Sequence, residues 1–448
     1  MIIDPSASGP WADSVIGLGW KARAILAPRD TEEAASLLRL AWKHRAQMIP
    51  QAANSSLLGA ALPDQSGAQF ILSSLRLTGI QIQVEDRTAR VGAGVRLSTL
   101  NRMAADHGLV FPIDVGADPM IGGMIGANTG GSKLIKYGGV RENVVGLRAV
   151  LADADATVLD LMSGARKDNT GLDLKQLFIG TSGSLGFVTE AIVALQRLPK
   201  AEAGALIGFR SAAAAVRLLG RCEARFGDLV SAFEGVSRPA LLLGAELADR
   251  RRLVETLNAA DYYSILELSS PVADLDLGTI LADFLSAEQE GGADVYDAAC
   301  FRTDDLWRIR DAIPPAVARA GSLLSFDIGL ARTQIPAFRE RAIAELTARH
   351  PSSTVCDFGH LADGGIHLTV LSPDDADERS PLGRRVAISR LVYELTVNDF
   401  GGSISAEHGV GPVNLPYYRW LVPETERRLS GSIQALCNPA KIIGRVMF

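Results

Sequence analysis

The stretch FGHLADGGIHL, residues 358–368, holds two of the six histidines in the chain, His360 and His367. If Asp363-Gly364 forms a two-residue hairpin turn, counting outward places His360 directly opposite His367. Opposed residues have Cβ atoms about 5 Å apart, so two imidazoles placed this way can converge on one metal ion. The spacing predicts a pair of metal ligands, and the alternative is a pair of histidines that simply face solvent.

A third ligand is available in SAEHGVG, residues 405–411, where Glu407 precedes His408 between glycines that allow close backbone approach. Two histidines and one carboxylate leave a coordination position open, which is typical of a catalytic rather than a structural metal site. The sequence therefore predicts a divalent-metal site at His360, His367 and Glu407.

The expected pattern of helices and strands that position these residues changes near residue 200. Before residue 200, strands are expected at 70–73 and 89–95, a hairpin across 144–162, and helices over 31–44 and 97–107, the first capped by Asp30 or Thr31. Beyond residue 200, helices alternate with strands. Helices are expected at 211–224, 277–288, 304–313, 336–349 and 384–398, and strands at 262–269, 293–299, 323–330, 353–360 and 365–371.

This alternation predicts the α+β class, with a sheet covered by helices in the second half. Domains are expected at 1–200 and 201–415, followed by a helical segment at 416–448 that packs on the first domain. The stretch LPKAEAG, around 198–203, is interpreted as the linker between the two domains.

Composition narrows the functional class. The 448 residues carry a net charge of −6 without a basic stripe, so nucleic acid is not expected as a partner. Four cysteines form no C-x-x-C pair and are interpreted as reduced thiols. The first residues lack a signal-peptide pattern, and no apolar run approaches the ~20 residues that span a bilayer. A cytoplasmic protein without a transmembrane segment is expected.

Three glycine-rich loops, at 52–61, 114–131 and 180–186, fall in the first domain. Such loops let backbone N–H groups approach a phosphate closely. The 114–131 stretch is followed by SKLIKYGGVREN rather than an amphipathic helix, and no G-K-[ST] occurs, so neither a Rossmann fingerprint nor a Walker loop is present. Because 114–131 is dense in glycine, we predict loop or close backbone packing there. One long cofactor across all three loops is expected, although any single loop could be only a tight turn.

Six ordered motifs carry a family resemblance: PQAANSSLLGAALP (50–63), IGGMIGANTGG (121–131), KYGGVRENVVGLRAVLAD (136–153), RKDNTGLDLKQLFIGTSGSLGFVTEA (166–191), FGHLADGGIHL (358–368) and GGSISAEHGVG (401–411). Together they resemble the FAD-linked oxidases and dehydrogenases of the vanillyl-alcohol-oxidase type. Within that type the chain is most similar to the D-2-hydroxyglutarate and D-lactate dehydrogenases. The resemblance covers nearly the whole chain.

The resemblance implies a two-subdomain FAD-binding domain at 1–200, a substrate-binding cap at 201–415, and a C-terminal segment that returns to the FAD domain. Because the 52–56 loop contains no histidine, non-covalent FAD is expected. The residues implied to bind it are Ala52, Ala53, Asn54, Ser55, Ser56, Gly59, Pro112, Gly116, Ala117, Ile121, Gly122, Gly123, Gly126, Asn128, Tyr137, Gly138, Gly183, Gly186, Val188 and Asn438.

The 52–56 loop departs from the family pattern. Relatives usually carry Gly-Gly-Asn-Thr-Gly where this chain has Ala-Ala-Asn-Ser-Ser. If any substituted position requires a positive φ, Ala or Ser there is strained by roughly 1 kcal/mol or more. Ser182 also stands where relatives usually have Glu. The resemblance therefore predicts either a shifted loop or weaker FAD binding.

The resemblance also assigns roles around the predicted metal. His360, His367 and Glu407 match residues that bind a divalent cation, usually zinc. His408 matches the residue that takes the substrate proton. Arg310 matches an arginine that binds the substrate carboxylate, a role that suits a planar guanidinium, whereas from the sequence alone an arginine near Trp307 is more often a surface residue.

Relatives that oxidise 2-hydroxyglutarate carry Thr, Lys and Asn where this chain has Pro314, Ser325 and Thr369. Without the lysine, a distal substrate carboxylate has no partner, and a buried unpaired carboxylate is unfavourable. We therefore expect a D-2-hydroxy acid with a shorter or less charged tail than 2-hydroxyglutarate, with Ser325 and Thr369 near it.

The predicted reaction is FAD- and metal-dependent oxidation of this acid to the 2-oxo acid, with hydride passing from C2 to flavin N5. One alternative is a metal-independent flavin oxidase of the same fold that acts on an alcohol, aldehyde or amine. Another is a non-catalytic subunit that has lost FAD binding. Electron-transfer flavoprotein, quinone, cytochrome and oxygen stay open as the electron acceptor, as does a homodimer.

Overall fold

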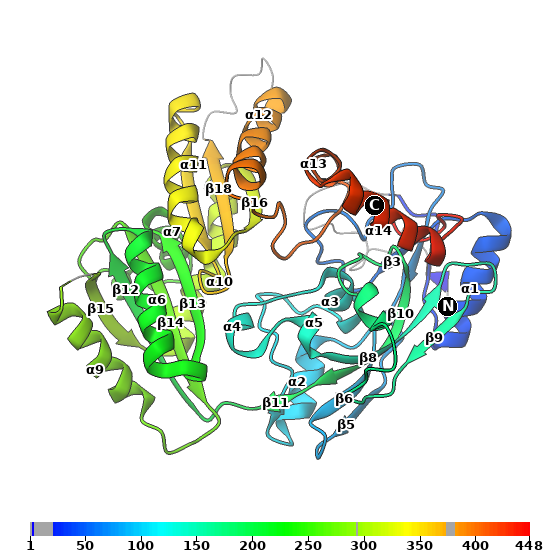
Figure 1. The fold of residues 1–448 in the computed structure, drawn as a ribbon, viewed down its shortest axis with the longest axis horizontal. Helices are drawn as coiled ribbons and strands as arrows, with labels where there is room; N and C mark the ends of the chain where they lie inside the picture. Colours follow the sequence, from blue (N-terminus) through cyan, green and yellow to red (C-terminus); the bar gives the residue numbers. More distant parts are fainter. Residues whose placement is uncertain (1, 4–20, 293, 373–380) are drawn as a thin grey trace. The chain divides into compact units, whose positions relative to one another are not determined.

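The computed structural model describes residues 2–3, 21–292, 294–372 and 381–448. The chain divides into two compact units (Figure 1). Unit 1 comprises 1–131, 138–198 and 407–448, and unit 2 comprises 132–137 and 199–406. Both combine helices with largely antiparallel sheets, so the predicted α+β class is confirmed. The predicted absence of a signal peptide concerns residues that lie mostly outside the described ones.

Unit 1 is built on two main sheets. The four-stranded sheet has a parallel set and one antiparallel edge strand, in the order β1 (Ile2–Ile3), β2 (Ala24–Leu26), β4 (Phe70–Ser73) and β3 (Met48–Gln51). The five-stranded sheet is antiparallel, in the order β5 (Ile80–Gln83), β6 (Thr88–Gly92), β10 (Gly186–Ala194), β8 (Val144–Leu151) and β9 (Val158–Leu161). A short pair joins β7 (Leu109–Val110) to β11 (Gln196–Arg197).

The helices of unit 1 include two that the sequence predicts, α1 and α2. Asp30 caps α1 as predicted, since its side chain accepts the N–H of Glu33 at 2.8 Å. The helices described in this unit are α1 (Thr31–His44), α2 (Leu97–Ala105), α3 (Ile121–Ala127), α5 (Val140–Asn143), α13 (Leu415–Leu421) and α14 (Glu424–Cys437).

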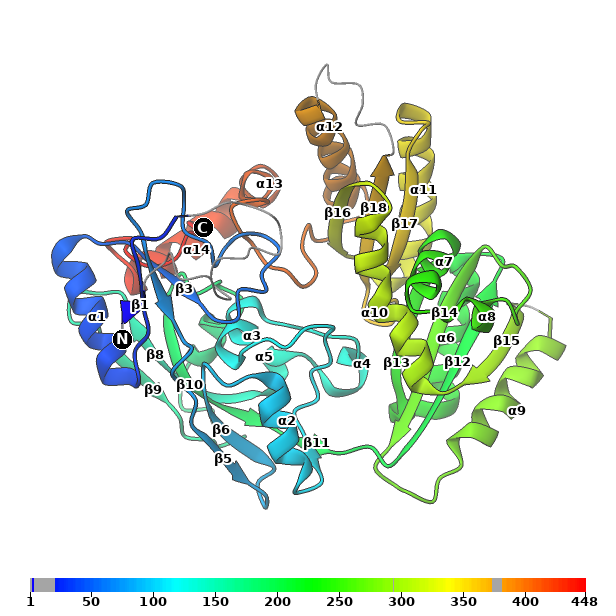
Figure 2. The ribbon, with the colours of Figure 1, turned by 180° about the vertical axis from the view of Figure 1, so that it is seen from behind.

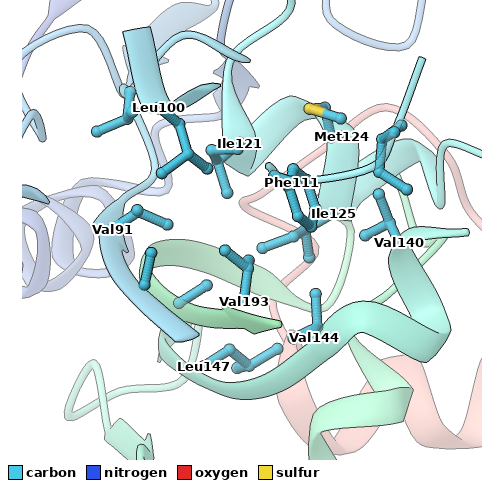
Figure 3. Packing of buried hydrophobic residues seen from close by; sticks show 14 of the residues in the cluster. Val91, Leu100, Phe111, Ile121, Met124, Ile125, Val140, Val144, Leu147 and Val193 are labelled. Atoms are coloured by element: carbon cyan, nitrogen blue, oxygen red, sulfur yellow. The ribbon is translucent and has the colours of Figure 1, made fainter. Parts of the chain in front are cut away.

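The core of unit 1 holds α3 against the antiparallel sheet (Figure 3). Val91 and Val193 come from the sheet, while Leu100 comes from α2 and Ile121 from α3. All four are buried. This apolar contact fixes the position of α3, on which the glycine-rich loops meet.

Of the two predicted alternatives for 114–131, loop or close backbone packing, the loop is wrong at 121–127, where α3 forms. Glycine inside a helix is unfavourable by about 1 kcal/mol relative to alanine. Here it allows close packing, because a Cβ on Gly122 would lie 2.7 Å from the Cβ of Ala93. Burial of Ile121, Met124 and Ile125 on the other positions favours the helix despite its glycines. The expectation of close backbone packing at this stretch is confirmed.

Unit 2 is a single seven-stranded antiparallel sheet. Its order is β15 (Val295–Phe301), β12 (Ala201–Phe209), β14 (Tyr262–Ser270), β13 (Val230–Ser237), β17 (Thr354–Gly359), β18 (Gly365–Ser372) and β16 (Ser322–Gly329). Helices α6 (Ala212–Phe226) and α9 (Leu277–Glu290) cover one face, and α7 (Arg238–Leu247) and α10 (Thr303–Arg319) cover the other (Figures 1 and 2). The remaining helices of the unit are α4 (Leu134–Tyr137), α8 (Arg251–Val254), α11 (Ile335–Arg349) and α12 (Pro381–Glu394).

Two parts of unit 2 differ from the prediction. The stretch interpreted as a linker at 198–203 runs into β12, which begins at Ala201. The pair β13 and α7, over 230–247, was not predicted. All eight residues of β13 are buried, so VSAFEGVS lacks the polar alternation by which a half-exposed strand is usually found.

Candidate functional site

Strands β17 and β18 form the predicted hairpin, but the predicted register is wrong. The ladder pairs Phe358, not His360, with His367. Residues 360–364 form the connection, and the carbonyl of His360 accepts the N–H groups of Asp363, Gly364 and Gly365 at 3.2, 3.1 and 3.1 Å. This gathering of three donors on one carbonyl closes a longer turn than the two-residue turn assumed from the sequence.

The longer turn still brings the two imidazoles together. The ring centroids of His360 and His367 lie 5.6 Å apart, with the ring planes at 82°. The His360 side chain is 8% exposed and that of His367 is 14% exposed, so neither faces solvent. Phe358 packs beside His367 with its ring centroid at 5.2 Å.

His360, His367 and Glu407 form a group in which one ligand atom from each residue lies within 4.8 Å of the others. Ligands at about 2.1 Å from one ion are at most about 4.2 Å apart, so this grouping is close to what a zinc-like cation requires. Two neutral nitrogens and one carboxylate oxygen also match the donor preference of such a cation. The residues therefore fit the predicted metal.

Asp327 anchors the backbone that leads into Glu407. It stands directly opposite His367 in the pairing of β16 with β18, and its Oδ1 lies 3.7 Å from His367 Nδ1. Its backbone carbonyl accepts the N–H of Ala406 at 3.3 Å, and its Oδ2 accepts the hydroxyl of Ser405 at 3.2 Å. One residue thus contacts a predicted ligand and fixes the segment that presents another.

Glu234 on β13 joins two of the predicted site residues, and the sequence did not single it out. Its Oε1 lies 2.6 Å from His360 Nδ1, and its Oε2 accepts from Arg310 Nε at 2.5 Å. Burial by itself raises the pKa of a carboxyl group, but the interactions of Glu234 with His360 and Arg310 lower its pKa to about 2. The sequence feature that could have identified Glu234 is that it is the one acidic residue in β13, whose other residues are apolar or small.

Arg310 is not the surface arginine that its sequence context suggests. It lies on α10, is 8% exposed, and has its guanidinium carbon 5.2 Å from the centroid of the Phe358 ring. Its ion pair with Glu234 and this cation–π contact fix the plane of the guanidinium. The predicted carboxylate-binding residue is therefore buried and held in a fixed orientation.

Ser325 and Thr369 face each other on neighbouring strands. They are direct partners in the pairing of β16 with β18, and their hydroxyl oxygens lie 3.2 Å apart. Thr369 is buried. Pro314 lies within α10, four residues beyond Arg310. The three positions together offer two hydroxyl groups and no charge.

In unit 1, the three predicted glycine-rich loops meet at α3. A Cβ on Gly123 would lie 3.0 Å from the Cβ of Ala52, in the 52–61 loop. The carbonyl of Gly126 accepts the N–H of Ser182 at 2.8 Å, and Gly183 beside it has φ of 72°. Residues of all three predicted loops therefore lie around one short helix.

The expected strain in the 52–56 loop is not found. Only Asn54 in this loop has a positive φ, 56°, and asparagine tolerates that region. The substituted residue that does adopt a left-handed conformation is Ser182, with φ of 51°, and its hydroxyl donates to the carbonyl of Val410 at 3.2 Å. Ala and Ser at the former glycine positions thus leave the loop backbone unstrained.

Two buried oxygens in the same region have no hydrogen-bond partner among the described residues, Gln51 Oε1 and Asn128 Oδ1. Buried acceptors of this kind are normally paired. Together with backbone loops that permit close approach, they fit a long polar cofactor that carries hydroxyl and phosphate groups, as FAD does.

Some of the predicted FAD residues have other surroundings. Tyr137 clusters with unit 2, where burial raises the pKa of its hydroxyl. The side-chain amide of Asn438 donates to the carbonyls of Ser184 and Ile443 and accepts the N–H of Ile442, so it ties the C-terminal segment to the 180–186 loop. Gly116 is exposed.

The segment that carries His408 rests on the glycine-rich loops of unit 1. A Cβ on Gly411 would lie 2.3 Å from the carbonyl oxygen of Leu58, and one on Gly409 would lie 3.9 Å from Ser182 Oγ. His408 itself is half-buried. The predicted proton acceptor is thus held beside the loops predicted to bind the flavin.

Comparison with known families agrees with these features. Residues 22–161 match the FAD binding domain family, and residues 198–446 match the family of FAD linked oxidases, C-terminal domain. The chain therefore belongs to the FAD-linked oxidases, and the predicted resemblance, FAD-binding domain and oxidoreductase class are confirmed.

Individual relatives fall in the same group. The mitochondrial D-2-hydroxyglutarate dehydrogenase of Danio rerio is 30% identical over 99% of this chain and 81% of its own length. A putative mitochondrial D-lactate dehydrogenase of Schizosaccharomyces pombe is 29% identical over 94% of this chain and 81% of its own length. The solved structure of p-cresol methylhydroxylase shares the fold, with a TM-score of 0.71 at 13% identity over 97% of this chain and 90% of that one.

Proposed function

We propose that the protein oxidises a D-2-hydroxy acid to the 2-oxo acid, with FAD as hydride acceptor and a divalent cation held by His360, His367 and Glu407. The observation that carries this proposal is the grouping of these three residues together with the link from His360 through Glu234 to Arg310. Relatives named as dehydrogenases of D-2-hydroxyglutarate and D-lactate support the substrate class.

Each side chain has a role set by its position. Bound FAD supplies the hydride acceptor, and the bound cation supplies Lewis-acid polarisation of the substrate hydroxyl. Arg310 binds the substrate carboxylate and orients C2. His408 accepts the hydroxyl proton, because imidazole exchanges protons near neutral pH. The protein thereby holds the carboxylate, the hydroxyl and the departing proton in fixed places.

The surroundings of Ser325 and Thr369 support a substrate with an uncharged or short tail. Both residues present hydroxyl groups, and their oxygens already lie within hydrogen-bond distance of each other. A second substrate carboxylate beside them would be partly desolvated without a cation, which is unfavourable. D-lactate and other acids with small or uncharged tails are therefore proposed ahead of D-2-hydroxyglutarate.

A panel of D-2-hydroxy acids tests this proposal. The purified protein, loaded with FAD and zinc, is assayed with an artificial electron acceptor on D-lactate, D-2-hydroxybutyrate and D-2-hydroxyglutarate, with the L-enantiomers as controls. We expect a higher kcat/KM for D-lactate or D-2-hydroxybutyrate than for D-2-hydroxyglutarate. The highest kcat/KM on D-2-hydroxyglutarate would refute the tail assignment, and no turnover on any acid would refute the substrate class.

The physiological electron acceptor, a homodimer and a cytoplasmic location stay predictions. None of the helices in the described parts of the chain is long and apolar enough to cross a membrane.

A further inference from the structure

We propose that Glu234 is a positioning residue that couples the metal site to the carboxylate-binding arginine, an inference that rests on the proposed function. Glu234 is proposed to contact neither the cation nor the substrate. It acts through His360 on one side and Arg310 on the other, so a single carboxylate sets the spacing between two groups that engage the same small acid.

The placement of Glu234 follows from strand register. The pairing of β13 with β17 sets Val236 opposite Phe358 and Gly235 opposite Gly359. Continued by one residue, this register places Glu234 beside His360, just where β17 ends. Because His360 lies in the connection rather than in the strand, the ladder alone does not hold its side chain. The Glu234 contact at 2.6 Å provides that restraint.

On the metal side, the contact determines which imidazole nitrogen is presented. Glu234 Oε1 engages Nδ1 of His360, so Nε2 is the nitrogen directed to a cation. A carboxylate behind a histidine ligand fixes the ring orientation and tautomer and makes the ligand more basic. Loss of such a partner typically weakens metal affinity by about 10–100-fold.

On the substrate side, the same carboxylate orients Arg310. Its Oε2 accepts from Arg310 Nε, while Phe358 packs against the guanidinium. A 2-hydroxy acid carries its hydroxyl and carboxylate on adjacent carbons, so the cation and Arg310 must keep a fixed separation. Glu234 bonds to a residue on each side of that separation.

A neighbouring carboxylate shows that burial alone does not create this arrangement. Glu267 on β14 is also buried, but its partners are Ser231, Trp307 and Lys133. A closer match is Asp357 on β17, which is fully buried and bonds to Arg339 at 2.7 Å. Asp357 resembles Glu234 in burial and in its arginine partner but contacts no predicted ligand, so it provides the matched control.

The test compares Glu234→Gln with Asp357→Asn in the full-length, FAD-loaded protein. Zinc affinity is measured by competition with a chromophoric chelator, without any substrate. We expect Glu234→Gln to bind zinc about 10–100-fold more weakly than wild type and Asp357→Asn to bind it as wild type does. The electronic spectrum of bound Co²⁺ should change in Glu234→Gln and stay unchanged in Asp357→Asn. With D-lactate, KM should also rise in Glu234→Gln.

Thermal unfolding and flavin content establish that each variant is folded. If Glu234→Gln does not fold, Glu234→Asp keeps the charge, shortens its reach, and should still weaken zinc binding relative to Asp357→Asn. The inference would be overturned if the folded Glu234 variant had the same zinc affinity and the same Co²⁺ spectrum as wild type. If wild type binds no zinc, both the inference and the metal site are wrong. If wild type binds zinc but oxidises no 2-hydroxy acid, the proposed function fails while the zinc comparison still decides the role of Glu234.

Discussion

His408 is the residue on which the proposed proton transfer depends. Replacement by alanine should lower the rate of flavin reduction by D-lactate about 10²–10⁴-fold, because a positioned proton acceptor is lost. FAD content should be unchanged, since the loops around α3 and not His408 are proposed to hold the cofactor. Stopped-flow measurement under anaerobic conditions gives this rate directly. His44→Ala, at the exposed end of α1, serves as control. An unaltered rate in His408→Ala contradicts the assignment.

For individual residues, the residue types and their spacing in the sequence predicted part of the site. The sequence identified His360, His367 and Glu407, and the structure brings them together although the pairing of His360 with His367 was wrong. Glu234 was not predicted, because its importance comes from the register between β13 and β17, which are more than a hundred residues apart in sequence. A side chain that acts through another has no local pattern of its own.

The connection between β17 and β18, residues 360–364, sets the position of His360. Gly364 has φ of 94°, and a Cβ there would lie 2.0 Å from the carbonyl oxygen of Leu330. Gly364→Ala should therefore destabilise the fold by about 1–3 kcal/mol and weaken zinc binding, as measured by urea unfolding and zinc titration. Gly220→Ala is the control, because Gly220 lies in α6 with no atom within 4 Å of the added Cβ. That variant should be neutral or stabilised by up to about 1 kcal/mol. Equal stability of the two variants is the contrary outcome.

Arg217 and Arg221 on α6 form ion pairs with Asp294, just before β15. The stability that these ion pairs contribute should depend on pH. Burial by itself raises the pKa of Asp294, but hydrogen bonds from Arg217 and Arg221 lower it below its ordinary value of 3.8. A lowered folded-state pKa gives stability that is present above the unfolded pKa and lost as pH falls through the folded pKa. Asp294→Asn should thus reduce the free energy of unfolding by about 1–3 kcal/mol at neutral pH.

The difference between wild type and Asp294→Asn should shrink as pH falls below 3.8. Urea unfolding of both proteins across this range measures it. A difference that stays constant with pH would show that the ion pairs of Asp294 do not contribute through its charge.

For the whole molecule, the sequence predicted two domains, and the structure has two units whose segments are more interleaved. Residues 132–137 cluster with unit 2, where Lys133 pairs with Glu267 at 3.1 Å and Lys136 Nζ lies 3.0 Å from Ser269 Oγ. Residues 407–415, predicted in the cap, cluster with unit 1. Changes in composition along the chain do not reveal that a segment packs on the other unit, because this packing depends on contacts between residues far apart in sequence.

The glycine-rich loops that meet at α3 form the proposed FAD cradle. Because FAD would bind there only in the folded chain, FAD should stabilise the fold. A ligand that binds only the folded state adds about 2.7 kcal/mol when its free concentration is 100-fold above its Kd. The unfolding transition that releases flavin, followed by flavin fluorescence, should therefore move to higher temperature as FAD is added. Riboflavin, which lacks the phosphates, should shift the transition less. A transition insensitive to FAD would count against the proposed cradle.

The dependence of flavin reduction on the metal is the most direct test of the proposed function. The FAD-loaded protein is mixed anaerobically with the best D-2-hydroxy acid of the panel, as zinc-loaded protein, after metal removal with EDTA, and after zinc is restored. Loss of several kcal/mol of transition-state stabilisation corresponds to roughly 100-fold or more in rate. We predict rapid flavin bleaching with zinc, a loss of at least about that size after metal removal, and recovery when zinc returns. Equally rapid bleaching without metal would contradict the account and would favour a metal-independent flavin oxidase.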